Sequence, residues 1–341
     1  MDDPALADLF NEKERPQLFP GSSPAMLTAS TDKTLRLWDL KTGTSQRTFH
    51  GHKGPVLCLR VDWVNWRAIS GSGDYTLAHW DVENCVWLAG FEGHTGAVSS
   101  VDVDWAAQRV VSGSYDQDLR IWDLQNTECM MTLKGHSGPV CGLSADWESG
   151  RVLSCAVDKT LRLWDLETGE CIQTVEGHTG PVWCVSYDGK FQQAVSGSMD
   201  RHLMYWDMRS GACIRAMLQH ARAIGAVNVD FEASQAISAS VDRSIFLWDL
   251  EIGEPLSKME KHAGTVSSLS VDWLGRRMIS GAGPGDGCVR LWDFSDGYCV
   301  SEIAGHDGAV WALDADWETA HKAAVEAKGL GIGSNEEEEG G

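Results

Sequence analysis

Residues 93–133, GHTGAVSSVDVDWAAQRVVSGSYDQDLRIWDLQNTECMMTL, contain the pattern that decides the fold. Short β-rich runs alternate with turn-forming Gly, Asp and Asn, and no run has the periodicity of a long helix. We expect four strands: one after Gly-His, one over RVVSGS, one over DLRIWD and one over ECMMTL. Such a sheet has two faces to bury, so neighbouring units must stack against it.

This unit recurs along the chain with a period of 42 residues. Seven Trp-Asp pairs mark it, and their tryptophans are residues 38, 80, 122, 164, 206, 248 and 292. The last interval is 44 because SGAGPGDGCVRLWD carries a two-residue insertion in one turn. A histidine and a turn aspartate keep the same spacing, which predicts a repeat architecture.

These motifs resemble those of the WD-repeat β-propeller family over residues 24–317. The resemblance implies an all-β, seven-bladed β-propeller of four-stranded antiparallel blades. The chain starts at a second strand, AMLTAS, and finishes on a first strand, AVWALDADW. We therefore expect three N-terminal strands and one C-terminal strand to close the ring, which removes its free edges. Residues 1–23 form an N-terminal extension, and residues 318–341 are expected to form a short helix and an acidic, disordered tail.

The resemblance also implies one buried hydrogen-bonded tetrad per blade, running from an indole through a hydroxyl and an imidazole to a carboxylate. The tetrads are His52, Ser70, Asp74 and Trp80; His94, Ser112, Asp116 and Trp122; His136, Ser154, Asp158 and Trp164; His178, Ser196, Asp200 and Trp206; His220, Ser238, Asp242 and Trp248; His262, Ser280, Asp286 and Trp292; and, across the ring closure, His306, Thr28, Asp32 and Trp38. A Ser-His-Asp set also suggests a hydrolase, but a catalytic set occurs once per active site and this set occurs seven times. We predict a structural role and no catalytic residue.

A second repeated feature follows the first strand of most units, as in VDWVNWRAIS, residues 61–70. Where Trp follows the aspartate, the fifth residue after the aspartate is Arg67, Arg109, Arg151 or Arg277, and the two units without this Trp carry Gln there. We predict that the arginine pairs with the aspartate and stacks on the indole, locking the hairpin. The alternative is a ring of exposed tryptophans that recruits a partner.

Non-repeated residues on the face that bears the turn aspartates are the candidate partner-binding residues. By family resemblance, the fifth position after the histidine and the position before the turn aspartate face the channel mouth. The bulky residues there are Trp183, Trp311, Tyr115 and Met199, which either anchor a peptide or plug the channel. Arg201, Arg222 and Arg243, with Lys33 and Lys159, form an arc for an acidic or phosphorylated segment, or an ordinary solvated rim.

Composition narrows the function further. The formal net charge of −21 argues against binding to nucleic acid. The ten cysteines show neither zinc spacing nor a disulfide framework, so we expect no metal and no cofactor. No apolar run is long enough to span a membrane, and the acidic N-terminus resembles no targeting signal, so we expect a cytoplasmic protein.

We predict a non-catalytic interaction scaffold or a subunit of a larger complex. The alternative is a peptide-reading propeller, and an enzyme is least favoured.

Overall fold

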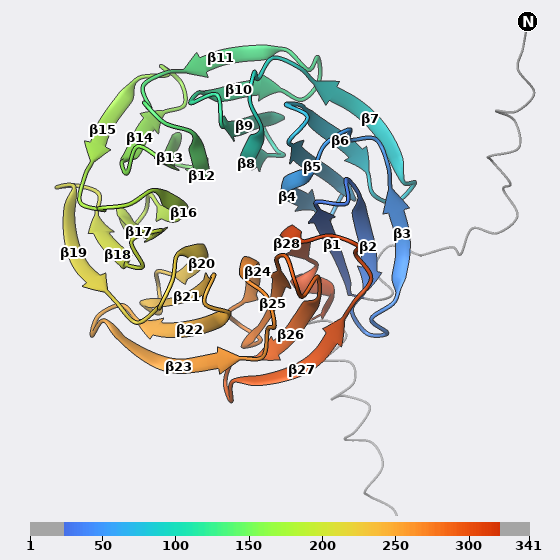
Figure 1. Cartoon of the computed structure of the whole chain (residues 1–341). Helices are drawn as coiled ribbons and strands as arrows, with labels where there is room; N and C mark the ends of the chain where they lie inside the picture. The colour runs from blue at the N-terminus through green and yellow to red at the C-terminus, as the bar shows by residue number, and fades with distance from the viewer. Residues whose placement is uncertain (1–23, 321–341) are drawn as a thin grey trace, which may run out of the picture.

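The computed structural model describes residues 24–320, which form seven four-stranded antiparallel sheets around a central channel (Figure 1). The first strand of each unit lies innermost and the fourth lies at the outer edge. The predicted seven-bladed β-propeller is therefore confirmed. A helical turn covers residues 317–320. The predicted N-terminal extension, the remaining residues of the predicted C-terminal helix and the predicted acidic tail lie outside the described residues.

The strands follow the repeat. Blade 1 contains β4 (Val56–Asp62), β5 (Arg67–Ser72), β6 (Leu77–Asp81) and β7 (Val86–Phe91). Blade 2 contains β8 (Val98–Asp104), β9 (Arg109–Ser114), β10 (Leu119–Asp123) and β11 (Cys129–Leu133). Blade 3 contains β12 (Val140–Asp146), β13 (Arg151–Ala156), β14 (Leu161–Asp165) and β15 (Cys171–Val175). Blade 4 contains β16 (Val182–Asp188), β17 (Gln193–Ser198), β18 (Leu203–Asp207) and β19 (Ala212–Met217). Blade 5 contains β20 (Ile224–Asp230), β21 (Gln235–Ser240), β22 (Ser244–Asp249) and β23 (Glu254–Glu260). Blade 6 contains β24 (Val266–Asp272), β25 (Arg277–Ala282), β26 (Val289–Asp293) and β27 (Tyr298–Ile303).

The closing blade joins the two ends of the chain. It contains β28 (Val310–Ala315), β1 (Ala25–Ser30), β2 (Leu35–Asp39) and β3 (Ser45–Phe49), in that order from the channel outward. β28 pairs antiparallel with β1, with Met26 opposite Ala315. The amide of Asp316 extends this pairing by donating to the Ala25 carbonyl at 2.9 Å. Closure by three N-terminal strands and one C-terminal strand is confirmed.

The core lies between neighbouring blades. In the layer between blades 1 and 2, Ile69 and Phe91 pack with Val98, Val110 and Trp122. The second strands are buried along nearly their whole length because both of their faces are covered. Their Ser, Gly and Ala residues allow the close approach of adjacent sheets. No helix within residues 24–320 is long and apolar enough to cross a membrane.

Candidate functional site

The tetrads are continuous hydrogen-bonded chains in the interior of every blade. In blade 4, the Trp206 indole donates to Ser196 Oγ at 2.8 Å, and Ser196 Oγ lies 2.8 Å from His178 Nε2. His178 Nδ1 lies 2.9 Å from Asp200 Oδ2. The same three bonds occur in the other six blades, at distances between 2.6 and 3.0 Å.

The closing blade assembles its tetrad from both ends of the chain. Thr28 supplies the hydroxyl, which lies 2.7 Å from His306 Nε2 and accepts a hydrogen bond from the Trp38 indole at 2.8 Å. His306 Nδ1 in turn lies 2.7 Å from Asp32. One hydrogen-bonded chain therefore fastens the C-terminal strand to the N-terminal ones.

The protonation state of the blade 4 tetrad follows from its surroundings. Burial lowers the pKa of His178 below its usual value, although the neighbouring Asp200 acts in the opposite direction. Burial tends to raise the pKa of Asp200, but hydrogen bonds from the turn amides and His178 outweigh it and lower that pKa to about 2. The aspartate is thus ionised and accepts the Nδ1 proton of a neutral imidazole, whose Nε2 accepts the serine hydroxyl proton. The seven hydroxyl residues are completely buried, away from any substrate: Thr28, Ser70, Ser112, Ser154, Ser196, Ser238 and Ser280.

The predicted Arg-Trp hairpin lock is wrong. Each arginine does lie opposite the aspartate in the strand pairing, as Arg67 lies opposite Asp62. However, the Arg67 guanidinium pairs with Asp81 at 2.7 Å, while Asp62 accepts hydrogen bonds from the amides of its own turn. Arg109 lies 3.7 Å from Asp104 but places its guanidinium over the ring of Trp147 in the next blade.

The arginine of blade 3 also departs from the lock. Arg151 extends to Gln192 of the next blade, where its Nη1 donates to Oε1 at 3.2 Å, and the Arg277 side chain is exposed. The turn amides satisfy the aspartate of the hairpin, as at Asp62. Arg67 then pairs within its own blade, whereas Arg109 and Arg151 reach a ring or an amide of the next blade. The motif therefore links blades more than it locks hairpins.

The hairpin tryptophans also contact the preceding blade. The indole of Trp273 donates to Asn228 at 2.8 Å, that of Trp317 to Ser270 at 2.9 Å, and that of Trp63 to Asp314 at 3.5 Å. All the acceptors occupy one repeated position, two residues before the repeated aspartate of the innermost strand. These partly buried indoles pack between blades, which does not fit the alternative of an exposed tryptophan ring.

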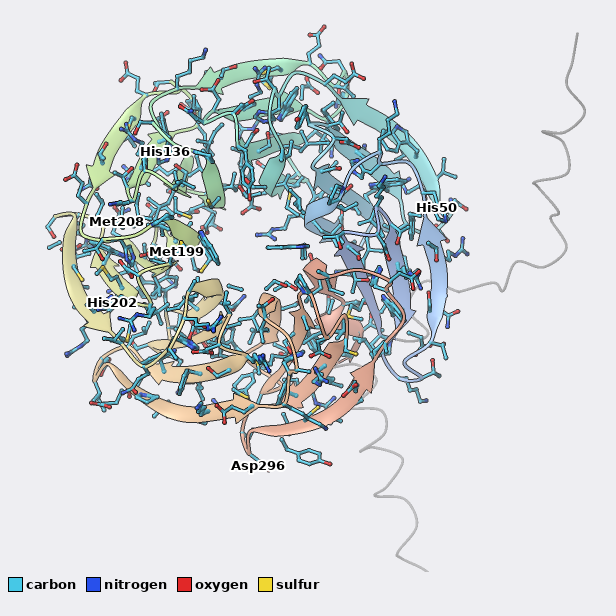
Figure 2. The ribbon with its side chains drawn as sticks, viewed as in Figure 1. His50, His136, Met199, His202, Met208 and Asp296 are labelled. Atoms are coloured by element: carbon cyan, nitrogen blue, oxygen red, sulfur yellow. The ribbon has the colours of Figure 1, made fainter. Side chains whose placement is uncertain are left out.

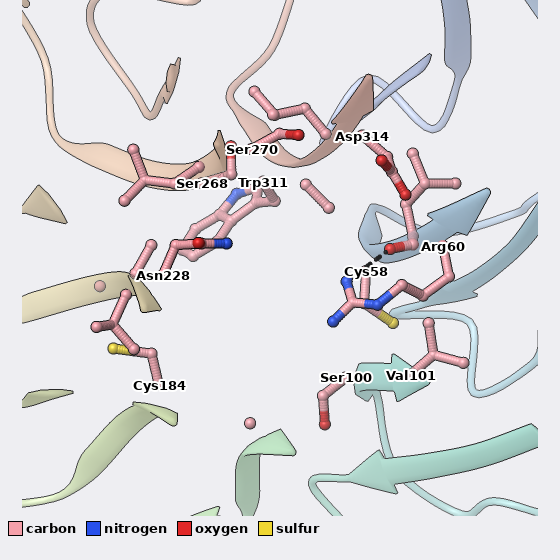
Figure 3. A pocket seen from close by; sticks show the side chains of 18 of the residues that line it. Cys58, Arg60, Ser100, Val101, Cys184, Asn228, Ser268, Ser270, Trp311 and Asp314 are labelled. Carbon is pink, nitrogen blue, oxygen red and sulfur yellow. Dashed lines mark hydrogen bonds between the residues drawn. The ribbon is translucent and has the colours of Figure 1, made fainter. Parts of the chain in front are cut away.

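The central channel encloses a cavity of about 470 Å³ lined by the innermost strands of all seven blades. Trp183 and Trp311 both line it, and Trp311 projects into the opening (Figure 3). On one side, only Gly225 and Ser267 occupy the equivalent positions between these two tryptophans. The channel mouth thus has two aromatic walls separated by a stretch of small residues.

Tyr115 and Met199 lie on the same face, in the turns between second and third strands. They are 51% and 54% exposed, which leaves more than half of each side chain available to a partner. Met199 lies toward the inner end of blade 4 (Figure 2). Arg201, Arg222 and Arg243 are exposed on blades 4 and 5, and within the described residues none of them lies within 4.0 Å of a carboxylate.

The sequence interpretation missed a charged cluster deeper in the channel. Arg60 lies 3.7 Å from Asp102 and points into the cavity (Figure 3). Burial raises the pKa of the adjacent Asp314 above its usual value, and Arg60 opposes this effect. The signal was available, because these residues share the repeated position that elsewhere holds Ser or Asn.

Within the described residues, the cysteines and the other potential metal ligands form no further site. All ten cysteines are free thiols. Across residues 24–320, no group of three or more His, Cys, Asp or Glu side chains is arranged to hold a metal ion.

Six segments of the chain match the family model described as WD domain, G-beta repeat: residues 43–81, 85–123, 127–165, 169–207, 211–249 and 253–293. Together they cover more than half of the chain. The chain belongs to the WD-repeat family. The seventh blade of this WD-repeat protein is the closing blade, whose strands come from both ends of the chain.

Local similarity connects this WD-repeat protein with several curated proteins. It is 42% identical over 36 residues to WD repeat-containing protein pop1 of Schizosaccharomyces pombe, a match covering 11% of this chain and 5% of the relative. It is 35% identical over 68 residues to F-box/WD repeat-containing protein 10 of Mus musculus, covering 16% and 7%. It is 42% identical over 69 residues to a probable E3 ubiquitin ligase complex SCF subunit, sconB, of Arthroderma otae, covering 20% and 9%. The matches thus span less than a tenth of each of these relatives.

Proposed function

We propose that this WD-repeat protein is a non-catalytic interaction scaffold, or a subunit of a larger complex, that binds a partner protein at the channel mouth. The observation that carries the proposal is the pair Trp183 and Trp311, which line one opening and are flanked by small residues. The sconB relative is named as a probable subunit of an E3 ubiquitin ligase complex, which supports the same role. The cytosol is the compartment in which we place it, and imaging of a fluorescent fusion tests that assignment.

The channel mouth suits a linear peptide segment. Aromatic side chains dominate the binding energy of protein interfaces because they bury a large area with little loss of conformational freedom. Trp183 and Trp311 supply two such walls, Gly225 and Ser267 leave room between them, and Tyr115 and Met199 extend the surface outward. Partner side chains inserted between the tryptophans would be shielded from water on both sides.

The test is affinity purification from the native cell with quantitative mass spectrometry. We expect the double variant Trp183→Ala with Trp311→Ala to lose at least one partner about tenfold or more, as for hot-spot residues. The matched control is Leu256→Ala with Leu274→Ala, which removes exposed side chains that do not line the channel. If the folded tryptophan variant recovers every partner at the level of the control, the channel-mouth function is wrong.

A second candidate ligand is an acidic or phosphorylated segment bound over blades 4 and 5. The supporting observation is that Arg201, Arg222 and Arg243 are exposed and unpaired among the described carboxylates. Guanidinium groups recognise phosphate through charge-assisted hydrogen bonds. A phosphopeptide array probed with the wild type and with the triple Arg→Ser variant tests it. Equal signals from the two proteins would eliminate this candidate.

A further inference from the structure

Blade 1 has a groove on its outer rim that belongs to neither the channel nor the tetrads. Its volume is about 680 Å³. Trp87 and Tyr75 form its aromatic walls, and His50, Lys53 and Glu92 lie along its edge. His50 lies toward the outside of the ring, away from the channel (Figure 2). Trp87 and Tyr75 are 38% and 50% exposed, so both rings remain open to a ligand.

The first difference between blade 1 and the other blades is that the indole of Trp87 occupies the space that an arginine guanidinium fills in blade 2. Four other blades carry Arg two residues before the tetrad tryptophan, at Arg36, Arg120, Arg162 and Arg290, whereas blade 1 carries Ala78. In blade 2, Arg120 lies 5.9 Å from the Trp122 ring and beside Gly93. In blade 1, the equivalent space beside Gly51 and Trp80 is filled by Trp87 from β7.

The indole of Trp87 is held in place from behind. A methyl group on Gly51 would lie 2.6 Å from its Cε3 atom, and one on Gly90 would lie 2.9 Å from Cζ2. The ring packs edge-on against Trp80, with centroids 4.9 Å apart, and lies 5.7 Å from His52. Only Gly at these two positions lets the indole lie this close, so the aromatic wall is preorganised.

The second difference is an aromatic residue, Tyr75, at a position that is basic in four other blades. Tyr75 follows the turn aspartate in the left-handed backbone region, with φ 76°. The equivalent position is basic in four other blades, at Lys33, Lys159, Arg201 and Arg243. Blade 1 therefore lacks both basic residues that the closing blade and blade 3 carry at these two positions, and presents two aromatic rings instead.

Blade 1 lacks these basic residues but keeps two carboxylates in the groove, those of Asp74 and Glu92. Asp74 accepts hydrogen bonds from His52, from the Lys53 amide and from Thr76, whereas the corresponding Asp32 and Asp286 each have an arginine nearby. Glu92 stands at the edge of the groove, and the whole chain has a net charge of −21. The cationic groups on the groove edge are Lys53 and, when protonated, His50. Aromatic faces beside carboxylates attract a cation, and a guanidinium also stacks flat on such faces.

We infer that this groove binds an arginine side chain from a basic segment of a partner protein, stacked on the open side of Trp87 beside Tyr75, with Glu92 as counter-ion. The bound guanidinium supplies from outside the charge that neighbouring blades supply with their own arginines. Lys53 opposes this charge and limits the affinity. The site is separate from the channel mouth, so the two surfaces can be occupied together.

The test measures fluorescence polarisation of a labelled peptide of alternating Gly and Arg residues, titrated with the full chain. The control peptide contains citrulline, which has nearly the shape of arginine and no charge. We expect the arginine peptide to bind at least about tenfold more tightly than the citrulline peptide, because a cation–π contact and a counter-ion act together. Added salt should weaken the binding of the arginine peptide. Equal binding of the two peptides would overturn the inference.

Three variants locate the binding in the groove. Trp87→Cys and Tyr75→Gln install residues that other blades carry at these positions, and each should weaken binding about fivefold to tenfold. Lys53→Ser should strengthen binding, because it removes a like charge. The Trp183→Ala with Trp311→Ala variant should bind as the wild type does.

These variants distinguish binding in the groove from non-specific attraction to the acidic surface of the protein. If Tyr75→Gln, Trp87→Cys and Lys53→Ser all bind the arginine peptide as tightly as the wild type, the peptide sits elsewhere on the acidic surface and the inference fails. Thermal melts confirm that each variant is folded. Tyr75→Gln and Lys53→Ser change exposed side chains, so they decide the matter even if Trp87→Cys disturbs the packing of Trp80.

Discussion

At the scale of single residues, the tetrads make this protein sensitive to acid. Burial lowers the pKa of His94, His178, His262 and His306, which are therefore neutral in the folded chain. Hydrogen bonds lower the pKa of all seven tetrad aspartates, which are therefore ionised. Both effects favour the unfolded chain as protons are added, because that chain binds them more readily.

The stability should fall in two stages as the pH is lowered. A histidine with a lowered pKa contributes fully above its ordinary value of 6.5, and this contribution is lost as the pH falls below 6.5. The Asp200 contribution is complete above 3.8 and is lost as the pH falls through 3.8 toward about 2. We expect the urea midpoint to be constant from about pH 8 to 7, to decline below about pH 6.5 and to decline again below about pH 4. Measurements in about 0.5 M salt limit the general repulsion among acidic side chains. A urea midpoint that stays constant from pH 7 to 5 would show that protonation of the histidines does not reduce the stability of the folded chain.

At the scale of elements, the contact between neighbouring first strands decides what the Asp-Trp motif does. The sequence spacing correctly places Arg67 opposite Asp62, because that relation depends on strand register alone. It does not reveal that the side chains have better partners across the blade boundary, such as Trp147 for Arg109. The groove of blade 1 was missed for a related reason: Trp87, Tyr75 and Ala78 depart from the repeat separately, and only the folded blade brings them together.

Two tryptophans at the same repeated position allow a matched test of the inter-blade hydrogen bond. Trp273 donates to Asn228 at 2.8 Å, whereas the Trp147 indole nitrogen is buried without a partner among the described residues. We expect Trp273→Phe to lower the free energy of unfolding by about 1 kcal/mol more than Trp147→Phe, because only the first change breaks a bond and leaves an acceptor unpaired. Urea denaturation of both variants measures the difference. Equal losses would mean that the indole N–H of Trp273 adds nothing to the junction of blades 5 and 6.

At the scale of the whole molecule, the ring depends on its closing blade. The number of blades, their strand order and the closure could all be predicted from the sequence, because each follows from the spacing of Trp-Asp pairs and from the partial units at the two ends. The tetrad bonds follow from the resemblance to the WD-repeat family, whose motif residues recur at that spacing. The unusual charges of Arg60 and Asp314 at one repeated position are visible in the sequence, but that this position faces the channel depends on how seven strands converge.

Removing the last strand should therefore unfold more than one blade. A chain ending at Ile303 lacks His306 and β28, so Thr28 and Asp32 lose their tetrad partner and β1 and β24 lose a neighbour. We expect the sharp thermal transition to disappear and protease resistance to be lost throughout. A chain ending at Ala320 keeps every described residue and is the control. Retention of a single cooperative transition by the shorter chain would show that six blades suffice.

The pairing of β28 with β1 also determines how the ring responds to force. Because the two strands are antiparallel, Ala25 and Asp316 lie at the same end of the pair, joined by a hydrogen bond of 2.9 Å. Tension applied between these two points would load the backbone bonds one after another, like a zipper, instead of shearing them all at once. The same junction that makes the propeller a closed ring is thus loaded in the unzipping direction when the chain is pulled at these two residues, and we expect the ring to open there first.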